Sequence, residues 1–154
     1  MKYFSFSILC MALVMLSGCG SGSGTPINGN WSATLTNTNG ATAFVFSLTM
    51  NENSSTGAVT VSNLSFTGSP PCFGQGNTGT GTFTSTSTAN GITTGNLQLT
   101  VQSGSSNGDG SNQLTLIGTL TQTTNNNTIT GTWNLTGTGS GCTGSGNFTM
   151  APAN

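Results

Sequence analysis

The chain of 154 residues almost completely lacks charge: it contains one basic residue, two acidic residues and no histidine. The basic residue is Lys2, and the acidic residues are Glu52 and Asp109. Nucleic-acid binding is excluded in practice, because neutralising phosphates requires Lys or Arg. Electrostatic attraction to anionic lipid is excluded for the same reason. The composition therefore predicts no nucleic-acid partner.

The groups that most hydrolytic enzymes need are also missing. Beyond Lys2 the chain offers neither His nor Lys to deprotonate one of its many Ser and Thr hydroxyls. Glu52 and Asp109 could in principle form a glycosidase-like acid/base pair, but isolated carboxylates in turn-like segments are more often solvated. The segment Asn107-Gly108-Asp109-Gly110 lacks the acidic ligands and terminal Glu of a calcium loop. We predict that the protein is not an enzyme and has no catalytic residue, cofactor or metal site.

No hydrophobic run is long enough for a membrane-spanning helix. The apolar residues 3–16 follow Lys2 and number fewer than the ~20 that a spanning helix needs. They end at Leu16-Ser17-Gly18-Cys19, which resembles the lipobox of bacterial lipoprotein signal peptides. In that family a peptidase cuts before the cysteine, and the new N-terminal Cys is acylated. The resemblance implies a signal peptide over residues 1–18 and lipidation (palmitate-type acylation) of Cys19.

The lipobox resemblance also implies a location in the cell envelope. Two or more acyl chains give stable membrane anchoring. Gly20, rather than Asp, follows Cys19, and in this family that favours the outer membrane of an organism with two membranes. The alternatives are an uncleaved membrane helix, an ordinary secretory signal, and Cys19 as a spare thiol in a flexible tail. Residues 19–28 then form the lipidated cysteine and a Gly/Ser tether, and residues 29–154 form one domain.

Helical periodicity is absent from residues 29–154, where short segments instead alternate apolar and polar residues. Asn39-Gly40 and Asn90-Gly91 are strong hairpin signals. The apolar face changes between Val61 and Leu64, which predicts a β-bulge near Ser62-Asn63. The alternation predicts eight strands near residues 31–36, 44–50, 59–66, 81–87, 97–101, 114–120, 129–135 and 148–150.

The devices that usually protect the edges of an open sheet are scarce, because Lys, Pro and inward-facing charges are almost absent. We therefore predict an all-β, eight-stranded antiparallel meander that closes into a barrel, with a two-sheet β-sandwich as the alternative. The outward faces are too polar for a transmembrane barrel. Side chains predicted to lie inside are Trp31, Phe46, Leu48, Val61, Leu99, Leu116 and Trp133.

Gly29-Asn30-Trp31 opens the first expected strand, and Gly-x-Trp at this place resembles the first-strand motif of lipocalins and related calycins. In those families the tryptophan packs across one end of an up-and-down barrel. They usually place an Arg or Lys against it, and residues 19–154 contain neither. The resemblance implies a barrel with Trp31 near one end, and it raises the hypothesis of a lipocalin-like binding module.

Four cysteines are present. The lipobox resemblance implies that Cys10 is lost with the signal peptide and that Cys19 carries the lipid. Cys72 and Cys142 remain, and two cysteines in an oxidising compartment most often pair. Closing a loop of this size would stabilise the fold by roughly 4 kcal/mol on the chain-entropy model. A metal site would need further ligands that the composition does not supply. We predict a Cys72–Cys142 disulfide.

Two functions follow from these observations. The first is a lipid-anchored, non-enzymatic envelope lipoprotein with a structural or interaction role, whose partner is an envelope protein. The second is a lipocalin-like module for a small apolar ligand, because Gly81, Ser85 and Ser87 would leave space if they faced inward. An apolar cavity of ~300 Å³ or more would favour binding, whereas a filled interior would favour the structural role.

Overall fold

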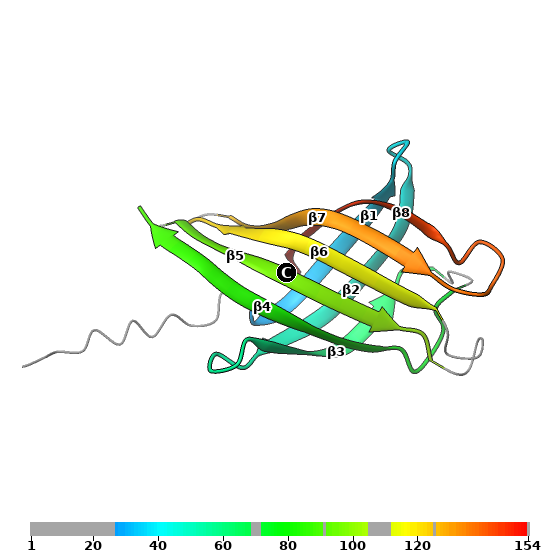
Figure 1. Cartoon of the computed structure of the whole chain (residues 1–154), viewed down its shortest axis with the longest axis horizontal. Coiled ribbons are helices and arrows are strands. Elements are labelled where there is room, and N and C mark those ends of the chain that lie inside the picture. The colour runs from blue at the N-terminus through cyan, green and yellow to red at the C-terminus, as the bar shows by residue number, and fades with distance from the viewer. Residues whose placement is uncertain (1–26, 69–71, 91, 105–111, 125, 154) are drawn as a thin grey trace, which may run out of the picture.

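The computed structural model describes residues 27–68, 72–90, 92–104, 112–124 and 126–153, and all regular structure in these ranges is β-strand. Eight strands follow one another: β1 (Gly29–Asn37), β2 (Thr42–Glu52), β3 (Ala58–Phe66), β4 (Thr78–Ala89), β5 (Ile92–Gln102), β6 (Gln113–Gln122), β7 (Asn127–Thr136) and β8 (Gly144–Pro152). Each strand pairs antiparallel with the next, and β8 pairs with β1, so the sheet closes into an up-and-down barrel (Figure 1). The predicted eight-stranded barrel is confirmed, and the sandwich alternative is wrong.

Alternation along each strand creates one apolar face and one polar face, and closure turns the apolar face inward. In β7, Ile129, Trp133 and Leu135 are buried, whereas the Thr and Asn residues between them are mostly exposed. Buried side chains from all eight strands form a single apolar cluster. Of the side chains predicted to lie inside, Trp31, Phe46, Leu48, Leu99, Leu116 and Trp133 are at most 3% exposed.

Val61 is the exception, because it is only half-buried and packs against the margin of the cluster. Asn63, two residues further along β3, has a positive φ of 52°. The β2–β3 register shifts here, with Ser47 opposite Ser65 but Thr49 opposite Ser62. The predicted bulge is therefore confirmed, and it turns β3 away from the regular ladder just after Val61.

The two ends of the barrel differ in their connections. Because successive strands alternate in direction, Ile27, the β2–β3 turn and Ala153 lie at one end, which we call the N-terminal end. Trp31 Nε1 donates to Ile27 O over 2.8 Å, and Ala153 N–H donates to Asn30 O over 2.9 Å. The β1–β2, β3–β4, β5–β6 and β7–β8 connections lie at the other end, which we call the loop end.

Candidate functional site

The predicted lipidation residue, Cys19, and residues 1–18 lie outside the described residues. The described domain starts at Ile27, at the N-terminal end of the barrel. Among the described residues, no helix has the length and apolar character needed to cross a membrane. Attachment through Cys19 therefore stays a prediction from the sequence.

Cys72 and Cys142 form the predicted disulfide, with their Cα atoms 5.3 Å apart. The bond joins the β3–β4 connection to the β7–β8 connection, and both cysteines are buried. The buried Asn112, from the β5–β6 connection, donates through Nδ2 to Cys72 O over 2.9 Å. Three connections are thus tied together over the loop end.

Phe73, directly after Cys72, closes the loop end of the barrel. Its side chain is 2% exposed and stacks on Phe66 with ring centroids 4.6 Å apart and planes 6° apart. Phe44 meets Phe73 edge-on at 6.1 Å and meets Trp133 edge-on at 5.8 Å. Phe73 was not among the side chains predicted to lie inside, although an aromatic residue beside a cysteine predicted to be bonded was a usable signal for a buried plug.

The interior beneath this plug is filled where glycines would otherwise leave space. A Cβ placed on Gly95 would overlap the ring of Phe83, and one on Gly118 would lie 2.6 Å from Phe148 Cζ. The rings therefore occupy the volume that the glycines leave empty. Phe83 and Phe148 are each 2% exposed and belong to the common apolar cluster.

The small residues that suggested a hollow interior do not create one. Gly81 faces Leu99 across the β4–β5 ladder, and a Cβ there would lie 3.3 Å from the Leu99 side chain. Ser85 and Ser87 are exposed to solvent. The physical reason is that β4 continues to Ala89, whereas its pairing with β3 ends at Thr82. The second half of β4 therefore extends past the part of the barrel that β3 helps to close.

The structure describes only one of the two candidate carboxylates. Asp109 lies outside the described residues, and Glu52, the last residue of β2, is half-buried at the N-terminal end of the barrel. Glu52 shares the inward face of Met50, and its Oε2 atom is shielded without a hydrogen-bond partner. Desolvation raises the pKa of the Glu52 carboxyl above its ordinary value. Among the described residues, no three potential metal ligands gather at one place.

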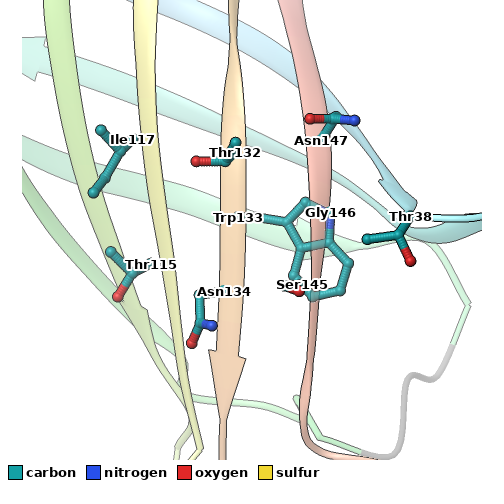
Figure 2. A pocket seen from close by; sticks show the side chains of 9 residues that line it. All are labelled: Thr38, Thr115, Ile117, Thr132, Trp133, Asn134, Ser145, Gly146 and Asn147. Atoms are coloured by element: carbon teal, nitrogen blue, oxygen red, sulfur yellow. The ribbon is translucent and has the colours of Figure 1, made fainter.

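A shallow groove of about 410 Å³ crosses the outer faces of β6, β7 and β8 (Figure 2). Ile117, on β6, is 58% exposed, and hydroxyl and amide side chains such as Thr132 and Asn147 surround it. Trp133 lies beneath the groove beside Gly146, and its Nε1 donates to Thr36 O over 2.9 Å. The groove contains no ionisable side chain, so it offers only neutral hydrogen bonds and a small apolar contact.

Comparisons of the chain with protein-family models, with curated proteins and with solved structures find no match. The assignment of the fold as a barrel therefore rests on the strand pairing of the structure alone. The lipobox and lipocalin resemblances stay predictions that rest on Leu16-Ser17-Gly18-Cys19 and on Gly29-Asn30-Trp31.

Proposed function

We propose that this protein is a lipid-anchored, non-enzymatic lipoprotein of the bacterial envelope, where its barrel has a structural or interaction role. The observation that carries the proposal is the packed apolar cluster inside the described part of the barrel. A barrel that transports a small apolar ligand needs an internal cavity, whereas here aromatic rings occupy the spaces opposite Gly95 and Gly118. In the described part of the chain, a partner would therefore be recognised through the outer surface, which consists mainly of hydroxyl and amide side chains.

The arrangement of the chain ends supports attachment through the N-terminus. The described domain begins at the N-terminal end of the barrel, and the disulfide-tied loops lie at the opposite end. A short Gly/Ser tether before Ile27 would leave the whole barrel exposed to the envelope space. Because the described surface carries so little charge, its partners would be bound through neutral hydrogen bonds and shape.

Lipid attachment is tested by replacing Cys19 with Ser in the full chain and following membrane fractionation and incorporation of labelled acyl chains. We expect the variant to lose the label and either to leave the membrane fraction or to accumulate as an uncleaved precursor. Cys10→Ser is the matched control, because it changes a thiol in the expected signal peptide outside the lipobox. A Cys19→Ser protein that is cleaved normally and stays with the membrane would refute the anchor.

The absence of ligand transport is tested separately on the protein purified from its native envelope. Native mass spectrometry should find the folded chain without a bound small apolar molecule. A stoichiometric ligand that stabilises the barrel would overturn the non-transport role and would favour the lipocalin-like alternative.

A further inference from the structure

The barrel is closed least completely between β3 and β4. Only three residue pairs join these strands, Ala58 with Thr82, Val59 with Gly81 and Thr60 with Thr80. In contrast, β4 and β5 pair over nearly the full length of both strands. Among the described residues, part of β4 therefore has no strand beside it on its β3 side.

The unpaired part of β4 runs from residue 84 to residue 89. The last backbone contact on its β3 side is the hydrogen bond from Phe83 N–H to Gly57 O, at 2.7 Å. Beyond it, the described residues pair β4 only with β5, and all side chains of residues 84–89 are exposed. Figure 1 shows this end of β4 and β5 extending past the β2–β3 turn. We call residues 84–89 the free edge.

The backbone of the free edge faces a side on which the described residues place no strand. Backbone donors and acceptors of alternate residues in an antiparallel strand face the same side. Phe83 directs its N–H toward Gly57, so the N–H and C=O of Ser85 face that side as well, beyond the point where β3 has ended. A β-strand that approached this side would find main-chain partners ready for pairing.

Natural sheets usually protect such edges with Lys, Pro, inward charges or bulges. The free edge contains no charged residue and no proline. One register shift, between Ser85 and Ser87, is the only protective device in this segment. Its Thr and Ser side chains favour extended structure and form cross-strand pairs, as the 3.1 Å contact between the hydroxyls of Thr86 and Thr94 illustrates.

We propose that the free edge is a self-association surface, on which β4 of one copy pairs antiparallel with β4 of a second copy. A second copy fits because the segment is uncharged and complementary to itself: Thr and Ser would face Thr, Ser and Ala. Like charges across such a pair would oppose it, and none are present. The near-neutral chain as a whole also offers little long-range repulsion between copies. The pairing joins the two barrels through a continuous sheet and does not require the lipid anchor.

Cysteine cross-linking in cells that express the full chain tests this pairing. Single Thr86→Cys and Ser87→Cys variants are oxidised mildly, and the disulfide-linked dimer is measured on a non-reducing gel against the wild-type background. Thr132→Cys is the matched control, because Thr132 is also exposed but β7 is paired along both sides. We expect a dimer band at one or both edge positions and none above background at the control.

A second substitution identifies the edge as the cause. Adding Ser85→Lys to the cross-linking variant places like charges near the proposed contact and should reduce the dimer at least about tenfold. Adding Thr132→Lys, which changes the net charge equally, should leave it unchanged. The proposal is overturned if both edge cysteines fail to cross-link, or if they link to another protein instead. It is also overturned if Thr132→Cys forms the dimer as well, or if Thr132→Lys reduces the amount of dimer as much as Ser85→Lys does. Loss of cross-linking is distinguishable from loss of anchoring, because membrane fractionation is scored in the same samples.

Discussion

Truncating Trp133 to Ala should be among the most destabilising single changes in this barrel. The side chain is 3% exposed, meets Phe44 edge-on at 5.8 Å and donates to Thr36 O over 2.9 Å. Burial of ~200 Å² at ~25 cal/mol per Å² contributes about 5 kcal/mol, most of which Ala cannot supply. The hydrogen bond adds about 1 kcal/mol, and partial collapse around the cavity recovers some of the loss. We therefore expect the free energy of unfolding to fall by ~3–5 kcal/mol.

The assay is equilibrium unfolding in urea, followed by far-UV circular dichroism and by the fluorescence of Trp31, which remains in the variant. Thr132→Ala is the control, because this neighbour is exposed on the opposite face and should cost less than about 0.5 kcal/mol. Trp133→Phe separates the two contributions, since it keeps an aromatic ring but removes the donor to Thr36. Similar losses for Trp133→Ala and Thr132→Ala would refute the strand register, and a Trp133→Ala loss below about 1 kcal/mol would refute the packing argument.

Three further changes test other parts of the structure. Replacing Cys72 and Cys142 together with Ser should lower the free energy of unfolding by about 4 kcal/mol, because the bond closes a 70-residue separation; an unchanged urea midpoint would contradict this. Desolvation raises the pKa of Glu52 above 4.5, so the resulting stabilisation is complete below about pH 4.5 and is lost as pH rises through the folded-state pKa. Glu52→Gln should therefore weaken the gain in stability that the wild type shows on acidification from pH 7, and identical pH profiles of the two proteins would disprove the assignment. Gly118→Ala should cost ~1–3 kcal/mol in thermal or urea unfolding, because its Cβ would lie 2.6 Å from Phe148 Cζ; a neutral effect would show that this ring has room to move.

The alternation of apolar and polar residues was sufficient to predict the eight strands and most of their buried faces. A side-chain period of two places Ile129, Trp133 and Leu135 on one face whatever the neighbours of that strand are. The turn at Asn39-Gly40 could also be predicted, because Gly40 has a positive φ of 84° and its N–H donates to Asn37 O. The bulge near Asn63 could also be predicted, because the apolar residues change from one face of the strand to the other between Val61 and Leu64. These features are local, so a short stretch of chain is enough to specify them.

The Cys72–Cys142 disulfide was predictable for a different reason. Only these two cysteines remained once Cys10 and Cys19 were assigned to the signal peptide and the lipid, so pairing required no knowledge of the fold. Which connections the bond would join over one end of the barrel became clear only from the direction of the strands. Lipidation of Cys19 also stays a prediction from the sequence.

What the sequence by itself determined is therefore the local pattern: strands, faces, turns, a composition with very few charges and two cysteines suited to pairing. Only the tertiary structure decided how completely the sheet closes, because closure depends on pairing between distant residues such as Trp31 in β1 and Pro152 in β8. The alternation of side chains along β4 put Ser85 on the same face as the buried Phe83, yet Ser85 is exposed. The reason is that this end of β4 extends beyond its pairing with β3, where no described strand covers it. Likewise, the stacking of Phe73 on Phe66 depends on a loop folding back over the barrel. Burial is a property of what surrounds a side chain, and distant segments supply those surroundings.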